Sequence, residues 1–337
     1  MLFESGYQRT IESTDVKLFI TGGAGFIGSN FARHILATTD HEVVVFDALT
    51  YAGNLDNLTD CSGNPRFTFV EGDICDRTTV RSAMAGCEGV VHFAAESHVD
   101  RSLMDPDVFV RTNCLGTNVV CDIASQLDVQ RFLHISTDEV YGSIEEGSFV
   151  ETDRLEPRSP YSAAKAGSDM IALAYHETHG LPLVLTRSSN QFGPYQFPEK
   201  LIPFFVTTLL EGGKVPLYGD GLNIRDWLFV LDNCTGVQTV FERGEIGQIY
   251  NIGADNERTN RQITDTILAA LGMDESSVEY VEDRKGHDRR YSIDTSRVSA
   301  LGWAPARTFE AAIEETIKWY VDNRGWWEPL RNRVKNR

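Results

Sequence analysis

A glycine-rich turn between a short apolar strand and a helix most limits the folds open to this chain. Residues Val16–Thr21 are mostly apolar, GGAGFIG follows at positions 22–28, and a helical pattern runs from about Ser29 to Ala37. Glycine permits a tight turn, lets helix and strand pack closely, and lets backbone N–H groups approach a pyrophosphate. This order of strand, turn and helix predicts the first unit of a parallel α/β sheet that binds a dinucleotide.

The residue after the second predicted strand indicates which dinucleotide. The strand covers Glu42–Phe46, and Asp47 follows it, 19 residues after Gly28. A carboxylate at this position accepts hydrogen bonds from the adenosine ribose hydroxyls and repels a 2′-phosphate. The sequence therefore favours NAD over NADP as the cofactor.

Further strands are expected at 66–70, 90–93, 132–135 and 183–188, with a helix from Asp105 to about Gln126. Asp73 has two interpretations, a hydrogen bond to the adenine amino group or an N-cap of the helix that follows. Ala94 and Ala95 suit a close approach to the cofactor, whereas a lone His98 is more often structural than catalytic. Together these elements predict an α/β, doubly wound parallel sheet of the Rossmann type.

A pair of carboxylates lies at the end of one predicted strand. Phe132–Ile135 reads as buried, and Thr137, Asp138 and Glu139 come just past it. Neighbouring carboxylates are costly to desolvate, and a sheet edge does not need them. Because ligands of open α/β sheets bind beyond the carboxyl ends of the strands, the pair predicts a site.

A tyrosine and a lysine follow about twenty residues later on a predicted helix that begins at Ser159-Pro160. Tyr161 and Lys165 are four residues apart, so they share one helix face. An ammonium group beside the phenol, with the positive nicotinamide, is expected to lower the tyrosine pKa from about 10 by several units. We predict a base that works near neutral pH. The alternative, an ordinary exposed Tyr and Lys, is common for a bare YxxxK but disfavoured after the glycine turn.

The second half of the chain changes in composition and predicts a smaller, loop-rich α/β substrate lobe. Prolines 194, 198 and 203 and several glycine turns follow the strand that ends at Ser188. A helix from about Asp232 to Arg243 and a strand at 250–252 are expected to return to the sheet, while a helix at 261–271 and a strand at 277–281 belong to the lobe. The predicted division is a loose extension at 1–15, an NAD-binding domain at 16–188 with a return segment at about 230–252, and a lobe at 189–229 and 253–330.

A basic run near residue 287 is unusual in a chain of formal net charge −18. Residues 283–291 read DRKGHDRRY. We expect this run, with Arg225, to contact phosphate, because guanidinium groups bind phosphate oxygens in pairs. The alternative is local salt bridging to Asp and Glu.

Charge and cysteine usage limit the partners and the compartment. With 31 basic and 49 acidic residues, the surface is expected to repel nucleic acid and anionic membranes. Only seven of the basic residues are lysines, which suggests adaptation to high salt, with ordinary acidic drift as the alternative. Six scattered cysteines without a CxxC pair, no metal-ligand pattern, no apolar run of transmembrane length and no signal peptide predict a cytoplasmic protein with reduced thiols.

These segments together resemble the extended short-chain dehydrogenase/reductase family, and within it the dTDP-glucose 4,6-dehydratases. The resemblance runs from about Lys17 to the region of Trp326 and includes GGAGFIGSN, HFAAESHVDRS, ISTDEVYG, YSAAK, FGPYQFPEKLIP, IRDWLFV, YNIGADNE and DRKGHDRRY. The glycine turn and YxxxK mark only the superfamily. The Thr-Asp-Glu triplet is more specific, since related 4-epimerases lack the acid pair.

The resemblance implies roles for individual residues. Catalysis would rest on Thr137, Asp138, Glu139, Tyr161 and Lys165. The NAD site would comprise Gly22, Gly25, Phe26, Ile27, Gly28, Asp47, Leu49, Thr50, Asp73, Ile74, Ala94, Ala95, Ser97, Thr112, Tyr161, Lys165 and Gln191. The substrate site would comprise Ser97, Thr137, Asn190, Lys200, Leu201, Pro216, Tyr218, Arg225, Asn260, Arg284, His287 and Tyr291. Gln191 and Lys285 depart from the residues usual in the family, an asparagine and a proline.

The implied activity is that of an NAD-dependent hydro-lyase. It would convert dTDP-glucose to dTDP-4-keto-6-deoxyglucose, a precursor of deoxysugars such as rhamnose in surface glycans. The family pairs the helices that begin near Asp105 and Tyr161 into a four-helix bundle, which implies a homodimer. The alternatives are a UDP-sugar 4-epimerase, a UDP-glucose 4,6-dehydratase, a UDP-glucuronate decarboxylase, or a non-catalytic NAD-binding regulator.

Overall fold

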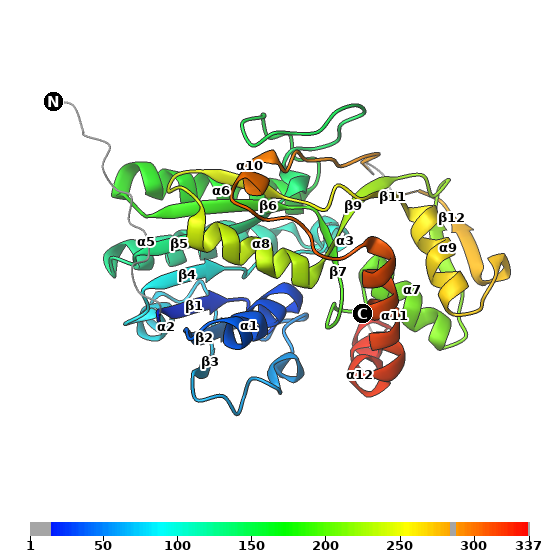
Figure 1. Ribbon diagram of the computed structural model, residues 1–337, viewed down its shortest axis with the longest axis horizontal. Helices are drawn as coiled ribbons and strands as arrows, with labels where there is room; N and C mark the ends of the chain where they lie inside the picture. The colour runs from blue at the N-terminus through cyan, green and yellow to red at the C-terminus, as the bar shows by residue number, and fades with distance from the viewer. Residues whose placement is uncertain (1–14, 284–287, 336–337) are drawn as a thin grey trace.

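A seven-stranded parallel sheet forms the larger part of the molecule (Figure 1). The computed structural model describes residues 15–283 and 288–335. The strands are β1 (Lys17–Thr21), β2 (Glu42–Asp47), β3 (Phe67–Glu71), β4 (Gly89–His92), β5 (Arg131–Thr137), β6 (Leu183–Ser188) and β10 (Ile249–Ile252). Their order is β10-β6-β5-β4-β1-β2-β3, and every neighbouring pair is parallel. The chain therefore reverses direction across the sheet between β1 and β4, the point where such folds bind ligands.

Helices cover both faces of the sheet, which confirms the predicted doubly wound fold (Figure 1). Successive side chains of β1 pack on opposite faces of the sheet, because side chains alternate along a strand. Leu18 and Ile20 belong to the core under α1 (Phe26–Thr38) and α8 (Val230–Arg243). Phe19 belongs to the core under α2 (Arg77–Met84), α5 (Thr117–Gln126) and α6 (Pro160–His179).

The helical run before β5 is more broken than the sequence indicates. The predicted helix from Asp105 to Gln126 consists of α4 (Pro106–Phe109), a π-helical turn η2 (Val110–Gly116) and α5. The short helix α3 (Val99–Met104) precedes it and was not predicted. His98 is the N-cap of α3, where its Nδ1 accepts from the backbone N–H of Arg101 at 3.4 Å, so its structural interpretation is confirmed.

The second lobe has its own sheets and its own aromatic core. One sheet has the order β11-β9-β7 and the other pairs β12 with β8. The strands are β7 (Asn190–Phe192), β8 (Val215–Tyr218), β9 (Ile224–Phe229), β11 (Glu257–Thr259) and β12 (Val278–Val281). The helices are α7 (Leu201–Leu210), α9 (Asn260–Ala270), α11 (Phe309–Asp322) and α12 (Arg324–Lys335). Short elements elsewhere are η1 (Leu55–Leu58), η3 (Asp138–Val140), η4 (Glu275–Ser277) and α10 (Ser296–Ala300).

The chain passes from the sheet domain into the second lobe after β6 (Figure 1). Phe192, Trp227, Phe229 and Phe309 fill the lobe core, which is separate from the two cores of the large sheet. The division of the chain near residue 189 stays a prediction. Within the described residues, no helix has both the length and the apolar character needed to span a membrane.

Candidate active site

A cavity of about 360 Å³ opens at the carboxyl ends of the central strands. It brings together most of the residues that the sequence and the resemblance indicated. These are Gly22, Gly25, Phe26, Ile27, Gly28, Asp47, Thr50, Asp73, Ile74, Ala94, Ala95, Ser97, Thr112, Thr137, Asp138, Glu139, Tyr161, Lys165, Asn190, Gln191 and Lys200. The predicted NAD residues and the predicted catalytic residues thus line a single cavity.

The glycine turn at one end of the cavity has no space for side chains at Gly22 and Gly28. Gly22 has a φ of 68°, and a Cβ there would lie 2.6 Å from the backbone nitrogen of Ala94. A Cβ on Gly28 would collide with the backbone of Gly22. The turn therefore leaves room for a ligand to approach the backbone at the first turn of α1, as a pyrophosphate requires.

Two aspartates extend this end of the cavity. Asp47 ends β2, and its carboxylate accepts from the backbone N–H groups of Ala24 at 2.9 Å and Leu49 at 2.8 Å. Burial raises the pKa of Asp47, while these two hydrogen bonds oppose the shift. Asp73 is paired with Arg111 at 2.8 Å. The alternative role of Asp73 as a helix cap is wrong, because Asp76 caps α2 through the N–H groups of Thr78 and Thr79.

The acid pair lies at the centre of the cavity, where β5 gives way to the single turn η3. The Thr137 hydroxyl donates to Asp138 at 3.1 Å and accepts from the Glu139 N–H at 3.2 Å. Burial, with the charge of Glu139 adding to it, raises the pKa of Asp138 to about 8. At neutral pH Asp138 is therefore a protonated acid beside a second carboxyl group, Glu139.

Tyr161 and Lys165 face the same cavity from α6, but their electrostatics differ from the prediction. The Tyr161 phenol is hydrogen-bonded to Thr137, and burial and the charge of Glu139 raise its pKa well above 10. Burial lowers the pKa of Lys165 to about 8, and its Nζ donates to the Ile135 carbonyl at 2.7 Å. The expectation that the lysine makes Tyr161 a phenolate is wrong for the chain by itself. The other predicted contribution, the positive nicotinamide, belongs to the cofactor.

Several polar atoms in the cavity wall fit a polar ligand. Asp138 Oδ2, Asn190 Oδ1, Gln191 Oε1 and Gln196 Oε1 are buried, and none has a hydrogen-bond partner among the described residues. Buried polar groups in native proteins are nearly always paired, so such atoms mark places where a ligand completes the bonding. The glycine turn, Asp47 and these atoms together fit a dinucleotide and a sugar.

Other predicted substrate residues lie outside this lining. Leu201, Pro216, Tyr218, Arg225, Asn260 and Tyr291 all belong to the second lobe, whereas Leu49 packs against the core of the large sheet. Arg225 stacks over the Tyr291 ring at 4.1 Å and donates to the Asp288 carbonyl at 2.9 Å. Arg284, Lys285 and His287 lie outside the described residues, so their assignment stays a prediction.

The basic run divides between the two interpretations offered for it. Arg289 pairs with Asp220 at 2.9 Å, and Arg290 pairs with Glu257 at 2.5 Å. For these two arginines the local salt-bridge alternative is confirmed. Arg225 remains a candidate phosphate contact.

Sequence reasoning missed part of the cavity wall, including Tyr51, Glu96, Gln196 and Glu199. Tyr51 is covered by Arg101, whose guanidinium carbon lies 3.6 Å from the ring centre, and its pKa is raised by burial. Glu96 and Glu199 each adjoin a predicted site residue, Ser97 or Lys200. Their position next to these residues, within HFAAESHVDRS and FPEKLIP, is the sequence signal that could have identified them.

Comparisons with known proteins agree with this geometry. The sequence model of the family described as GDP-mannose 4,6 dehydratase matches residues 19–316. A dTDP-glucose 4,6-dehydratase of Streptomyces antibioticus is 53% identical over 325 residues, covering 94% of this chain and 96% of the relative. The low-salt glycan biosynthesis protein Agl12 of Haloferax volcanii is 51% identical over 304 residues, covering 90% and 98%.

Solved structures show the same fold. DesIV, a dTDP-glucose 4,6-dehydratase from Streptomyces venezuelae crystallised with NAD and TYD bound, superposes with a TM-score of 0.92 at 52% identity, covering 93% of this chain and 99% of that one. A UDP-glucose 4-epimerase from Thermotoga maritima has a TM-score of 0.85 at 28% identity, covering 91% and 99%. The Thr-Asp-Glu triplet in the cavity and the near-complete matches lead to one conclusion: the chain belongs to the dTDP-glucose 4,6-dehydratase family.

Proposed function

We propose that this chain converts dTDP-glucose to dTDP-4-keto-6-deoxyglucose and water, with NAD regenerated in each turnover. One observation carries the proposal: Asp138 is buried next to Glu139 in the cavity that also holds Tyr161, and this burial raises the Asp138 pKa to about 8. A dehydration needs such a split into an acid and a base, because one group must remove a proton while the other protonates the leaving hydroxyl.

The first step is oxidation at C4 of the sugar. Tyr161, as a phenolate that the positive charge of bound NAD would favour, would accept the proton of the 4-hydroxyl, with Thr137 hydrogen-bonded to the phenol and Lys165 on the same helix face. Bound NAD would supply the acceptor for the C4 hydride, a positive charge and, in its reduced form, the source of the hydride for C6. Oxidation comes first because the C5 hydrogen becomes acidic only when it is next to a C4 carbonyl.

The second step is elimination of water. Glu139 removes the C5 proton, and Asp138 donates its proton to the departing C6 oxygen, so that water leaves and a C5=C6 double bond forms. Glu139 then returns its proton to C5 as C6 is reduced. The protons balance, because Glu139 returns the proton that it took from C5, Tyr161 releases the proton of the 4-hydroxyl to solvent and Asp138 regains one from solvent. The sugar loses one water molecule.

The rival on this scaffold is a 4-epimerase, which needs only oxidation and re-reduction at C4. It would leave Asp138 and Glu139 without a function, although their burial is costly. Mass spectrometry of the product separates the reactions: loss of water for the dehydratase, no change for the epimerase, and loss of carbon dioxide for a decarboxylase. Tyr161→Phe should abolish every step. A product of unchanged mass from dTDP-glucose would overturn the proposal.

The nucleotide is the least constrained part of the proposal. Thymine is favoured because relatives 53% identical to this chain are named dTDP-glucose 4,6-dehydratases, and we expect the second lobe to contact the base. Parallel incubations with dTDP-glucose and UDP-glucose, each at low and high KCl, test this choice. Faster turnover of UDP-glucose would assign the chain to UDP-glucose dehydration instead.

A homodimer is part of the same proposal. Large apolar side chains are exposed on adjoining helical segments: Leu103 and Met104 on α3, Val110 and Leu115 on η2, and Met170 on α6. A second copy that pairs these helices into a four-helix bundle would bury them. Met104→Glu should shift the protein to monomer in analytical ultracentrifugation, whereas Val321→Glu, at an exposed position of α11, should not. A wild-type monomer at micromolar concentration would contradict the dimer.

The compartment and pathway follow from less direct observations. All six cysteines are unpaired, which is typical of a reducing cytoplasm. The proposed product is the usual precursor of 6-deoxysugars such as rhamnose. We therefore place the enzyme in the cytoplasmic synthesis of deoxysugar precursors for surface glycans.

A further inference from the structure

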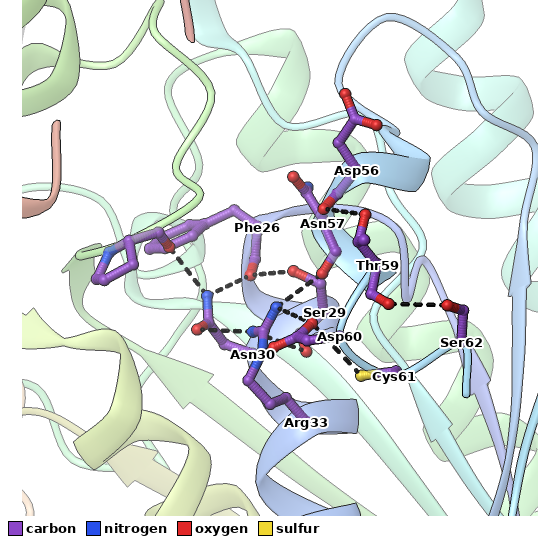
Figure 2. Close-up of polar contacts among 11 residues, drawn as sticks. Phe26, Ser29, Asn30, Arg33, Asp56, Asn57, Thr59, Asp60, Cys61 and Ser62 are labelled. Carbon is purple, nitrogen blue, oxygen red and sulfur yellow. Dashed lines mark hydrogen bonds and ion pairs between the residues drawn. The ribbon is translucent and has the colours of Figure 1, made fainter. Parts of the chain in front are cut away.

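A polar cluster joins the glycine turn to the C-terminal part of the chain. Figure 2 shows the Arg33 side chain of α1 beside Asn30 and directed toward Asn57 of η1 and Asp60. Arg33 donates to the Asn57 carbonyl at 2.8 Å and to Asp60 at 2.5 Å. The cluster lies beside residues 48 and 50–53, which line the proposed NAD cavity.

Asn57 is the centre of this cluster. It is 1% exposed, and its Nδ2 donates to the carbonyl of Ala24 in the glycine turn at 2.9 Å. The same carbonyl accepts from the backbone N–H of Asn54 at 3.1 Å. The segment at residues 48–58, which we call the cofactor loop, is therefore tied to the glycine turn by Asn54 and Asn57.

The oxygen of the Asn57 side chain is hydrogen-bonded to a residue of the C-terminal helix. Trp326 of α12 donates its indole N–H to Asn57 Oδ1 at 2.9 Å. The Trp326 ring packs on Trp319 at 5.0 Å and on Tyr195 at 5.8 Å, measured between ring centres. Helix α12 lies beyond residue 316, where the match to the family model ends.

Tyr195 links the same cluster to the substrate side of the cavity. Arg33 lies over the Tyr195 ring at 4.4 Å, and Asn30 donates to the Pro194 carbonyl at 3.0 Å. The residues that follow, Gln196 and Phe197, line the cavity. The cofactor loop, the glycine turn and this loop of the second lobe thus share one set of contacts.

We infer that Trp326 and Asn57 are positioning residues that hold the cofactor loop against the glycine turn, so that helix α12 governs how long NAD stays bound. Retention matters because a cofactor that is oxidised and reduced within one turnover must not leave midway. This inference rests on the use of NAD in the proposed function. It assigns a role to the C-terminal helix that the chemistry at Asp138 and Tyr161 does not require.

The test compares two adjacent tryptophans of α12. Trp326→Phe keeps an aromatic ring but loses the N–H that reaches Asn57. Trp327→Phe is the matched control, because its indole N–H donates to the Tyr320 carbonyl at 2.7 Å, within the second lobe. Each holoenzyme is loaded with radiolabelled NAD, chased with excess unlabelled NAD, and sampled by rapid gel filtration.

One hydrogen bond between neutral groups is worth a factor of about three to ten in an equilibrium or rate, so Trp326→Phe should release NAD about three- to tenfold faster. Trp327→Phe should release NAD at the wild-type rate, even where its unfolding temperature is lower. Asn57→Ala should also accelerate release, and combining it with Trp326→Phe should add little, because the two residues share the bond.

The outcomes separate this inference from the proposed function. If wild-type enzyme dehydrates dTDP-glucose but both tryptophan variants release NAD at the same rate, the inference is wrong and the function stands. If wild-type enzyme holds no labelled NAD at all, the proposed function fails with it. If the effects of Asn57→Ala and Trp326→Phe on the NAD release rate are fully additive, the two residues do not act through one shared hydrogen bond, which would also contradict the inference.

Discussion

At the scale of single residues, the pKa values in the site depend more on burial than on neighbours in the sequence. The sequence placed Asp138 and Glu139 together, but it did not decide which of them keeps a proton. Asp138 is 3% exposed, and this burial is the main cause of its high pKa. In the chain without a cofactor, the same effect raises the pKa of Tyr161 well above 10, because desolvation and the charge of Glu139 both act across the folded cavity. Such environments are not visible in a YxxxK pattern.

The Asp138 pKa predicts how stability changes with pH. A carboxyl group whose pKa rises from 3.8 unfolded to about 8 folded stabilises the protein only while it is protonated, so stability is lost as pH rises through this window. Asp138→Asn removes the titration. The unfolding free energy of the variant relative to wild type should therefore grow between pH 5 and about 8, by at most about 1.4 kcal/mol per pH unit.

Urea unfolding of both proteins at several pH values measures this difference, with matched protein concentrations. Glu139→Gln is the comparison that keeps Asp138 in place while removing the neighbouring charge, and it should lower the Asp138 pKa. A difference between Asp138→Asn and wild type that stays constant from pH 5 to pH 8 would show that Asp138 ionises normally.

At the scale of elements, a buried polar chain fixes the turn that carries the acid pair. Arg187 on β6 donates to Asp169 of α6 at 3.0 Å and to the Tyr141 hydroxyl at 2.9 Å. Tyr141, two residues after Glu139, donates in turn to Asn251 of β10 at 2.8 Å. Strands β6 and β10 and helix α6 thereby hold the end of η3 in place.

Arg187→Leu should be strongly destabilising, because it leaves the carboxylate of Asp169 buried without its partner. Breaking a buried pair in this way costs about 3–5 kcal/mol of unfolding free energy. Lys318→Ala is the matched control, since its pair with Asp322 is exposed and such pairs contribute about 1 kcal/mol or less. Equal losses for the two variants in urea unfolding would mean that the buried chain does not anchor the turn.

Elements were predictable to the extent that their signals are local. The seven parallel strands came within a few residues of their observed bounds, because apolar runs and the glycine turn mark them. Helix α1 nevertheless begins at Phe26, about three residues before the predicted start. Strands β7 and β11, three residues each, gave no such signal, because they are stabilised by pairing with β9. The π-helical turn in η2 likewise has no sequence signature.

At the scale of the whole molecule, the net charge of −18 dominates the surface. Repulsion among like charges destabilises a compact state, and salt screens it within a Debye length of about 3 Å at 1 M. We therefore expect both the unfolding temperature and the activity to rise from dilute buffer to molar KCl. Full stability and activity in dilute buffer would instead indicate ordinary acidic drift.

The sequence predicted the cavity-lining residues of the sheet domain better than those of the second lobe. The residues predicted for catalysis, and those predicted for NAD except Leu49, line one cavity, since the carboxyl ends of parallel strands must meet at one edge. Six predicted substrate residues of the second lobe lie outside that lining, because their distance from the cavity depends on how the two lobes pack, which no local pattern encodes.

The most direct test of the account follows the separate steps of the reaction in two variants mixed with dTDP-glucose in heavy water. We predict that Asp138→Asn accumulates NADH absorbance and exchanges deuterium into C5 but releases little 6-deoxy product, because Glu139 still removes the C5 proton while the acid for C6 is lost. Glu139→Gln should accumulate NADH without exchange at C5. If Asp138→Asn shows neither NADH absorbance nor C5 exchange, or turns over at the wild-type rate, the division of the pair into an acid and a base is wrong.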